Sequence, residues 1–220
     1  MYLFGASGHG KVVHDIVRAT GGRVDAFIDD APAAPTLCGR PVLSGRTGLA
    51  PVIVSIGANH VRRLIAGRLG GPFATAVHPS AVVSPTACVG EGTVVMPGAV
   101  IGTGATVGRH CIVNTGTVIG PYCHVADFCH IAPHATLCTA VHVGEESMVG
   151  VGAVVTDNIH IGSCCTIGAR AVVIHNIADN MKQAGVPAKP LVARKADLRG
   201  GKLTHRRVVA LHERRYPHAA

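Results

Sequence analysis

The sequence predicts a small Rossmann-like α/β domain, followed by a parallel β-helix of hexapeptide repeats and a basic C-terminal extension. Three observations lead to this fold class. Residues 77–173 carry an aliphatic residue at every sixth position. The chain is 48% hydrophobic, yet it has no Trp, three Tyr and four Phe against 28 Gly, which favours narrow and repetitive packing. The first twenty residues read as a short strand, a glycine-rich turn and a helix.

The first turn is a candidate ligand site. Its sequence is Gly5, Ala6, Ser7, Gly8, His9 and Gly10. Glycines let the backbone approach a ligand closely, and the start of the following helix offers free N–H groups to a phosphate. A turn of this composition can also serve packing alone.

Two further strands complete a small βαβαβ unit. The segment "RVDAFIDD" ends in Asp29 and Asp30, and the segment "APVIVSIGAN" leads into a helix that continues as "NHVRRLIAGRL". In such units ligands bind beyond the carboxyl ends of the strands, where both the glycine turn and the two aspartates lie. Acidic residues about twenty positions after a glycine turn are typical of nucleotide binding.

The repeat of six begins at Val77. Every sixth residue from Val77 to Val173 is Val, Ile or Leu, and the residue four places after each is mostly small. A period of six does not fit an α-helix, but it fits a two-residue strand plus a turn. Three units then close one triangular coil of eighteen residues, and the aliphatic side chains stack inside it. Aromatic rings do not fit in so narrow a prism.

Four of the eight cysteines occupy the small inward position of this repeat, and we interpret them as buried core residues that bind no ligand. They are Cys111, Cys123, Cys129 and Cys165. The other cysteines show no paired spacing, and no export signal accompanies them, so we expect reduced thiols and a cytoplasmic location.

The net charge of +8 is concentrated at the C-terminus, where residues 191–220 hold eight Lys and Arg against Asp197 and Glu213. Such a tail could bind nucleic acid, anionic lipid or a phosphorylated substrate, and the simplest interpretation is a solvated extension. No run of eighteen apolar residues predicts a membrane span.

We divide the chain into the Rossmann-like domain (residues 1–75), the β-helix (residues 76–190) and the basic C-terminal tail (residues 191–220).

The order of several motifs resembles the bacterial nucleotide-sugar N-acetyltransferases and sialic acid O-acetyltransferases, in which a Rossmann-like domain precedes a left-handed β-helix. The matching segments cover residues 1 to about 190. They are "FGASGHGKVV", "FIDD", "SIGANHVRRLI", "VHPSAVVSPTA", "VNTGTVIG", "CHIAPHATL" and "GVPAKP".

The resemblance implies a homotrimer with active sites at the subunit interfaces, a nucleotide-sugar substrate and acetyl-CoA as co-substrate. It implies no metal, nucleic acid or membrane. The positions that match the nucleotide-sugar site are Ser7, Gly8, His9, Gly10, Asp29, Asp30 and Asn114. Those that match the acetyl-CoA site are His130, Val151, Ala169, Val186, Pro187 and Lys189.

The sequence departs from the family where a base is expected. Related proteins carry an acid–His–acid triplet after "NT..VI", whereas this chain has Gly120, Pro121 and Tyr122. Pro121 cannot move a proton. His130 matches the family's second histidine, which is associated with the thioester end of CoA. His124 and His130 are therefore the candidate catalytic residues.

His124, His142 and His160 are spaced by eighteen and should stack on successive coils, facing outward. A neutral histidine can act as a base near pH 7. A stacked trio can also bind a metal such as zinc, or form a surface ladder without a function.

We predict an acyltransferase that transfers an acetyl group from acetyl-CoA to the amino group of a nucleotide-linked amino sugar. Alternatives are an O-acetyltransferase of a sialic-acid-like sugar or transfer of another acyl group, a catalytically silent scaffold that binds nucleotide sugar, and a metal-dependent lyase of the carbonic anhydrase kind.

Overall fold

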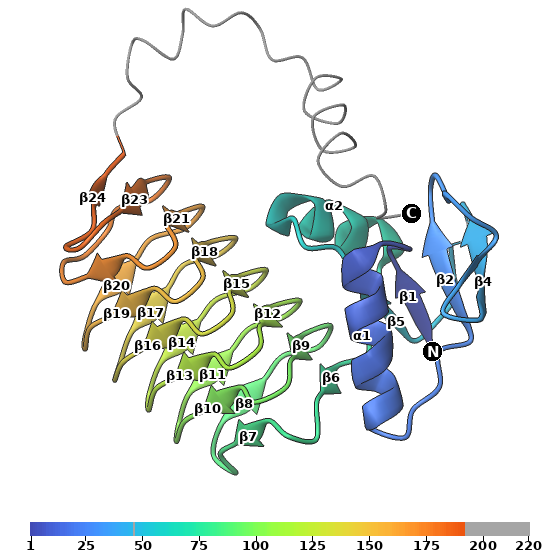
Figure 1. Ribbon diagram of the computed structural model, residues 1–220, viewed down its shortest axis with the longest axis horizontal. Coiled ribbons are helices and arrows are strands. Elements are labelled where there is room, and N and C mark those ends of the chain that lie inside the picture. The colour runs from blue at the N-terminus through green and yellow to red at the C-terminus, as the bar shows by residue number, and fades with distance from the viewer. Residues whose placement is uncertain (46, 192–220) are drawn as a thin grey trace, which may run out of the picture. The chain divides into compact units, whose positions relative to one another are not determined.

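The computed structural model describes residues 1–45 and 47–191, so all but the first residue of the basic extension lies outside the described residues. Residues 1–190 form one compact unit, in which an α/β region precedes a parallel β-helix (Figure 1). The predicted fold class is therefore confirmed. Within the described part of the chain, no helix has the length and apolar character needed to cross a membrane.

The N-terminal region is a five-stranded sheet with the strand order β3-β4-β2-β1-β5. Its elements are β1 (Tyr2–Phe4), α1 (Gly8–Ala19), β2 (Ala26–Asp29), β3 (Thr36–Leu37), β4 (Arg40–Ser44), β5 (Val52–Val54) and α2 (Asn59–Leu69). The pairs are parallel except β3–β4. The three predicted strands are β1, β2 and β5, which are almost wholly buried. The strands β3 and β4 contain no fully buried residue, so they lack the buried apolar run that would predict them.

The β-helix follows α2 and is built from two-residue strands, all in described residues. They are β6 (Ala76–Val77), β7 (Val82–Val83), β8 (Cys88–Val89), β9 (Val94–Val95), β10 (Val100–Ile101), β11 (Thr106–Val107), β12 (Ile112–Val113), β13 (Val118–Ile119), β14 (His124–Val125), β15 (His130–Ile131), β16 (Thr136–Leu137), β17 (His142–Val143), β18 (Met148–Val149), β19 (Val154–Val155), β20 (His160–Ile161), β21 (Thr166–Ile167) and β22 (Val172–Val173). Each strand pairs in parallel with the strand eighteen residues away.

The coil has three faces, which we name by their neighbours or side chains. The domain face is β24-β23-β21-β18-β15-β12-β9-β6, the valine face is β22-β19-β16-β13-β10-β7, and the histidine face is β20-β17-β14-β11-β8. The chain visits them in that order. The turn after a domain-face strand is the domain–valine corner, and the turn after a valine-face strand is the valine–histidine corner.

The core of the β-helix is the aliphatic column that the repeat predicts. From Val95 to Val173 its members are at most 3% exposed. The predicted burial of the four inward cysteines is also confirmed, since each is at most 1% exposed. The period breaks after Val173, where β23 (Lys182–Ala184) and the antiparallel β24 (Lys189–Pro190) close the domain face.

The N-terminal region shares a hydrophobic cluster with the first coils of the β-helix. Leu3, Val13 and Phe27 pack in the same cluster as Val94 and Ile112. The two regions therefore bury this surface jointly, and the domain boundary at residue 75 stays a prediction.

Replacing Ile131 by Ala tests the internal column. Ile131 is 0% exposed, so we expect a loss of about 2–5 kcal/mol in the free energy of unfolding. Urea denaturation followed by circular dichroism measures it. Cys88→Ala changes an exposed outward position of the same kind of strand and should cost less than about 0.5 kcal/mol. Equal losses of unfolding free energy in the two variants would contradict a buried aliphatic core inside the coil.

Candidate active site

The glycine-rich turn lies at the carboxyl end of β1 and is shaped by close backbone contacts. Gly5 has φ +116°, and a Cβ there would come within 2.8 Å of the carbonyl oxygen of Ser55. A Cβ on Gly10 would collide with the carbonyl oxygen of Gly5. Ser7 and Gly8 are exposed at the start of α1, so their N–H groups are open to a ligand.

The Asp29 carboxylate organises this turn. Its Oδ2 accepts a hydrogen bond from Ala6 N at 2.9 Å, and its Oδ1 accepts one from Ala31 N at 3.0 Å. Asp30 instead forms a two-pronged ion pair with Arg68 of α2, at 2.9 and 3.1 Å. The structure thus brings Asp29 to the glycine turn, as predicted from strand order, while Asp30 is held toward the end of α2.

Arg62 of α2 is the buried cation at the junction between the α/β region and the β-helix. It is 1% exposed and donates six hydrogen bonds. The acceptors are His110 O (2.7 Å), Ile56 O (2.9 Å), Gly57 O (3.2 Å), Asn59 Oδ1 (2.8 Å), Phe128 O (2.8 Å) and Cys129 O (3.3 Å). Burial lowers the pKa of Arg62 to about 10, so it stays charged at neutral pH. Among the described residues no carboxylate forms an ion pair with it.

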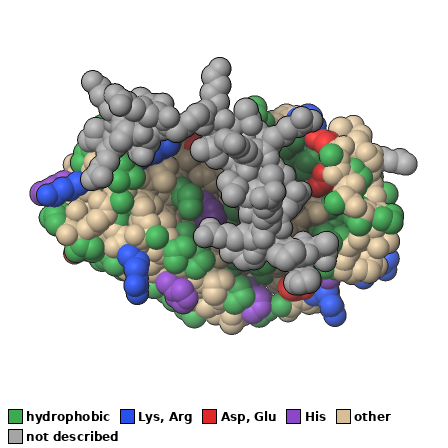
Figure 2. Space-filling model, turned by 45° about the horizontal axis from the view of Figure 1, so that its top comes forward, with side chains coloured by type: hydrophobic (Ala, Val, Ile, Leu, Met, Phe, Trp, Pro, Cys, Tyr) green, Lys and Arg blue, Asp and Glu red, His purple; other side chains and the backbone are tan. Residues whose placement is uncertain are grey.

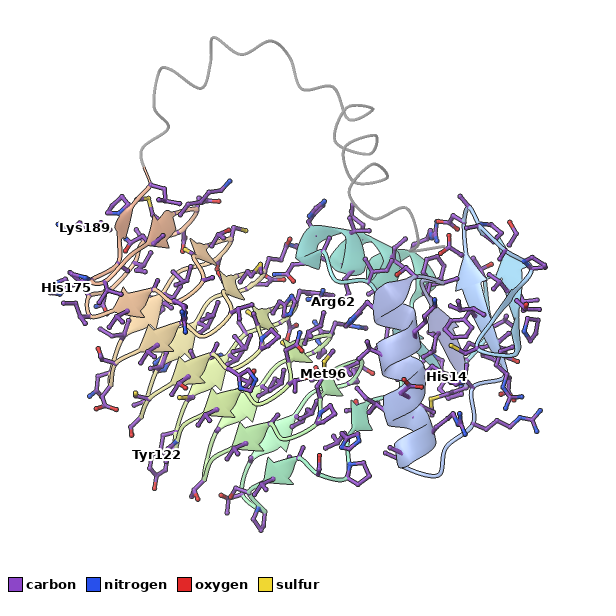
Figure 3. The ribbon with its side chains drawn as sticks, viewed as in Figure 1. His14, Arg62, Met96, Tyr122, His175 and Lys189 are labelled. Atoms are coloured by element: carbon purple, nitrogen blue, oxygen red, sulfur yellow. The ribbon has the colours of Figure 1, made fainter. Side chains whose placement is uncertain are left out.

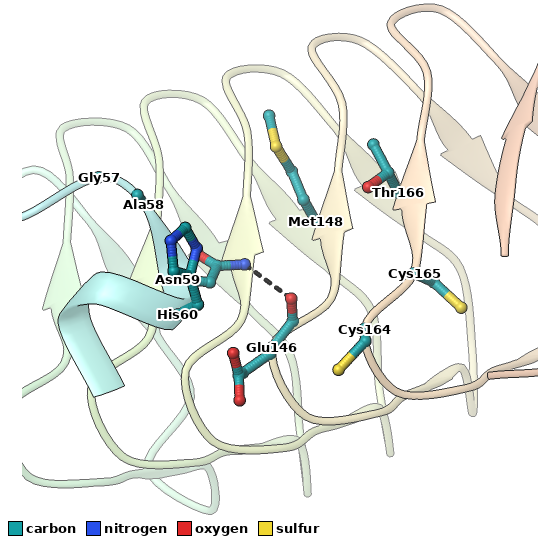
Figure 4. Close-up of a pocket in the computed structure, with 9 residues that line it drawn as sticks. All are labelled: Gly57, Ala58, Asn59, His60, Glu146, Met148, Cys164, Cys165 and Thr166. Carbon is teal, nitrogen blue, oxygen red and sulfur yellow. Dashed lines mark hydrogen bonds between the residues drawn. The ribbon is translucent and has the colours of Figure 1, made fainter. Parts of the chain in front are cut away.

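Two neighbours of Arg62 hold the same helix against the β-helix. Asn59 Nδ2 donates to Glu146 O at 2.9 Å and to Ser147 O at 3.2 Å (Figure 4). Arg63 forms an ion pair with the Glu146 carboxylate. Ser147 O also accepts a hydrogen bond from the His130 N–H at 3.0 Å, so α2 is tied to the coil that pairs with His130.

His130 lies on the domain face with one ring nitrogen engaged. Asn114 Oδ1 accepts a hydrogen bond from Thr115 N at 2.8 Å, which assigns the other atom of this amide as nitrogen. Asn114 Nδ2 therefore donates to His130 Nε2 at 3.0 Å. Nε2 is then the acceptor and Nδ1 carries the proton. Burial, followed by the positive charge of Arg62, lowers the pKa of His130 to about 4, so the ring is neutral at pH 7.

His9 shares this electrostatic environment. Burial and Arg62 lower the pKa of His9 to about 4, and His9 in turn contributes to the lowered pKa of His130. The buried Nε2 of His9 has no hydrogen-bond partner among the described residues. The glycine turn and the domain face thus bring two neutral imidazoles to one region beside a buried cation.

A pocket of about 370 Å³ continues from this region along the domain face (Figure 4). It lies between the start of α2 and the outward side chains of two coils, and its lining includes Asn59, His60, Met148, Cys164 and Thr166. His130, Met148, Thr166 and Lys182 are register partners on adjacent strands. The pocket therefore extends a column of outward side chains that begins at His130.

The residues expected to bind acetyl-CoA follow the same edge. Val151 and Ala169 are eighteen residues apart, at the domain–valine corner of successive coils, and both are exposed. Pro187 is also exposed and lies in the turn between β23 and β24, beyond the break in the period. Val186 is 74% exposed, and Lys189 lies in β24 at the end of the domain face. Asn114 directly follows β12 and lies at the same corner, on an earlier coil.

His124 is not brought to this edge within one chain. It lies on the histidine face, where it stacks with His142 at 5.9 Å between ring centroids, and His142 stacks with His160 at 6.1 Å. The predicted ladder is thus confirmed, and histidine side chains are visible on the surface in Figure 2. Residues 1–45 and 47–191 contain no group of three or more His, Cys, Asp or Glu that could hold a metal ion. Tyr122, the neighbour of Pro121, lies at an edge away from Arg62 (Figure 3).

Sequence reasoning missed Arg62 and Asn59. A signal was present, because Arg62 falls in helical spacing with Ile65, Ala66 and Leu69, and so occupies the inner side of α2. A charge at such a position is buried only where several acceptors surround it.

Comparisons with known proteins show which family this sequence and fold resemble. Residues 1–69 match the family described as the PglD N-terminal domain. The perosamine N-acetyltransferase of Caulobacter crescentus, solved with CoA and GDP-perosamine, is 36% identical with a TM-score of 0.81. The alignment covers 87% of this chain and 96% of that one. The acetyltransferase domain of PglB from Neisseria gonorrhoeae, solved with acetyl coenzyme A, is 37% identical with a TM-score of 0.79. That alignment covers 86% of this chain and 98% of that domain.

A UDP-N-acetylbacillosamine N-acetyltransferase of Bacillus subtilis is 37% identical over 105 residues, which are 42% of this chain and 49% of that protein. The match thus spans about half the length of that relative. Fold and relatives together place the chain among the acyltransferases of the hexapeptide-repeat type. The chain belongs to the family of nucleotide-sugar N-acetyltransferases.

Replacing Arg62 by Met tests its electrostatic effect. Loss of the positive charge should raise the pKa of His130 from about 4 toward its ordinary value, because no nearby cation would then disfavour the protonated ring. Titration of the ring signals by NMR measures this pKa. Arg62→Lys keeps the charge and should keep the pKa low. Arg63→Met removes an exposed cation of the same helix and should leave the pKa near 4. An unchanged pKa in folded Arg62→Met would assign the whole shift to burial.

Proposed function

We propose that this protein is an acetyl-CoA-dependent N-acetyltransferase that acylates the amino group of a nucleotide-linked amino sugar. The observation that carries the proposal is the His130–Asn114 hydrogen bond. It fixes a neutral imidazole between the glycine-rich turn of the α/β region and the pocket along the domain face. The relatives solved with CoA, GDP-perosamine and acetyl coenzyme A support the same pair of substrates.

In this proposal the nucleotide sugar binds the α/β region. The N–H groups at Ser7, Gly8, His9 and Gly10 receive the diphosphate at the start of α1. Asp29 holds the turn in place through Ala6 N. The neighbouring Asp30 is a candidate contact to the nucleoside, and it would give up its ion pair with Arg68 to make that contact. The sugar extends toward Asn114, whose amide already contacts His130.

The acyl-CoA lies along the column that starts at His130. Its thioester is placed at His130, and its arm follows the pocket past Met148 and Thr166. The exposed residues Val151, Ala169, Val186 and Pro187 flank this path, and the Lys189 ammonium is available to a phosphate at its end. Acetyl-CoA as the donor is also consistent with the expected cytoplasmic location.

The chemistry is a direct transfer without an acyl-enzyme. The sugar amine attacks the thioester carbonyl, the C–N bond forms, the C–S bond breaks and CoA leaves as the thiol. His130 Nδ1–H donates a hydrogen bond to the carbonyl oxygen as it gains negative charge, and the buried charge of Arg62 favours the same change. An unprotonated amine already presents its lone pair, so it needs less assistance from a base than a hydroxyl. Pro121 at the usual base position therefore favours N-transfer over O-transfer.

We further propose a homotrimer built on the valine face. The outward residues of this face are aliphatic on nearly every coil, and Val82 is 63% and Val100 36% exposed. A continuous apolar stripe of this kind is typical of an interface. If three valine faces surround a threefold axis, the domain–valine corner of one chain meets the valine–histidine corner of the next. His124 could then act only from a neighbouring copy.

The first test is turnover. The protein is mixed with acetyl-CoA and UDP-, GDP- and dTDP-linked amino sugars, and free thiol and product mass are measured. We expect one acetyl group added for each thiol released. His130→Ala should lower kcat about 10²–10³-fold, because a preorganised donor to the oxyanion is lost. His142→Ala, an exposed histidine on another face, is the matched control. Nucleotide-sugar binding without turnover would favour the scaffold alternative.

Assembly is tested separately by light scattering after gel filtration. We expect a trimer for the wild type and smaller species for Val100→Glu, since burying a carboxylate on an apolar interface is costly. His142→Glu places the same charge on the histidine face and should leave the trimer intact. Dissociation by His142→Glu alone would place the contact on the histidine face instead.

A further inference from the structure

The proposed reaction needs an acceptor for one proton that a base at position 121 would otherwise take. When the amine attacks, its nitrogen becomes positively charged and must lose a proton before the amide is complete. Pro121 has no group that could take it. The Nε2 lone pair of His130 is occupied by the Asn114 amide at 3.0 Å, and His124 lies on a different face of the same chain.

His134 lies at the corner where the proposed reaction takes place. It belongs to the turn between β15 and β16, four residues after His130, and its side chain is exposed. Its backbone is left-handed, with φ +57°. The ring lies over Gly116 of the preceding coil, where an added Cβ would be 2.5 Å from the ring atoms Nδ1 and Cε1. Glycine at 116 therefore makes room for this imidazole.

Hydrogen bonds connect this turn to the His130 site. The His134 N–H donates to Thr115 O at 2.9 Å. Thr115 N in turn donates to Asn114 Oδ1 at 2.8 Å, and the amide of Asn114 binds His130. Gly152, at the same position one coil further on, has no side chain to cover His134 from that side. The backbone of His134 is thus tied to the turn that follows Asn114, and its exposed imidazole lies over Gly116.

We propose that His134 is the proton acceptor of the acyl transfer, in place of the absent base at position 121. This assignment rests on the proposed N-acetyltransferase function. As the C–N bond forms, one amine proton passes to a ring nitrogen of His134. The C–S bond breaks, and the thiolate takes up a proton to leave as CoA thiol, which the imidazolium of His134 can supply. Protons balance without a further co-reactant.

The position also fits the proposed trimer. His134 lies on the domain–valine corner, and Pro121 lies on the valine–histidine corner that a neighbouring chain would bring beside it. A base supplied from His134 therefore occupies the region that a base at position 121 would reach from the other side of the interface.

The test compares His134→Asn with the wild type in the full chain. Asparagine accepts a left-handed backbone but cannot act as a base near pH 7, so folding should be retained. We expect kcat to fall about 10²–10⁴-fold, with KM values for both substrates within about twofold. Added imidazole should restore part of kcat in His134→Asn and leave His142→Ala unaffected. Partial rescue is the readout that a purely structural role would not produce.

Four outcomes would overturn the assignment. Turnover that survives His134→Asn overturns it alone and leaves the acetyltransferase function standing. A loss confined to KM for acetyl-CoA, without rescue by imidazole, makes His134 a binding residue. A loss in His124→Ala that imidazole rescues, with His134→Asn unaffected, moves the role to the histidine face. Absence of turnover by the wild type with every acceptor would overturn both proposals.

Discussion

The geometry of the site depends on the buried guanidinium of Arg62. A cation taken out of water is tolerated only when its donors are satisfied, and Arg62 achieves this with six oxygen acceptors, five of them main-chain carbonyls. The acceptors lie just before α2, at its first residue and on two coils of the β-helix. Movement of either region would leave a buried charge unpaired. A carboxylate partner would have stabilised Arg62 more simply, but it would also have cancelled the positive charge that acts on His9 and His130.

Much of the fold could be predicted because one repeated constraint acts on nearly half of the chain. Each coil must place an aliphatic side chain inside a narrow prism every six residues. The pattern can therefore be recognised in a single sequence, and Ile131 or Val155 can be assigned to the core by counting. The same counting placed the inward cysteines. It failed at β3 and β4, none of whose residues is fully buried, so the positions are not required to be apolar. It also could not show that Leu3 and Ile112 would share one cluster.

The site was only partly predictable, for a related reason. Glycine turns and strand ends have local signatures, so the region around Gly8 and Asp29 was found. The function of Asp29 as an acceptor for Ala6 N, and the pairing of Asp30 with Arg68, depend on side-chain directions that sequence does not give. The tautomer of His130 follows from its hydrogen bond with Asn114, sixteen residues earlier. This contact exists only because adjacent coils stack on one another, so it cannot be read from the local sequence.

The triangular coil offers a route by which the proposed chemistry could proceed without a base at position 121. Its faces meet at corners, and residues eighteen apart occupy the same corner on successive coils. In the proposed trimer two different corners of neighbouring chains converge, so a proton acceptor can be supplied from either chain. Proline at position 121 removes it from one side. Histidine at position 134, seated over Gly116, places an imidazole on the other side, next to the Asn114 that fixes His130. The hydrogen-bond donor and the proton acceptor would then come from a single coil, four residues apart.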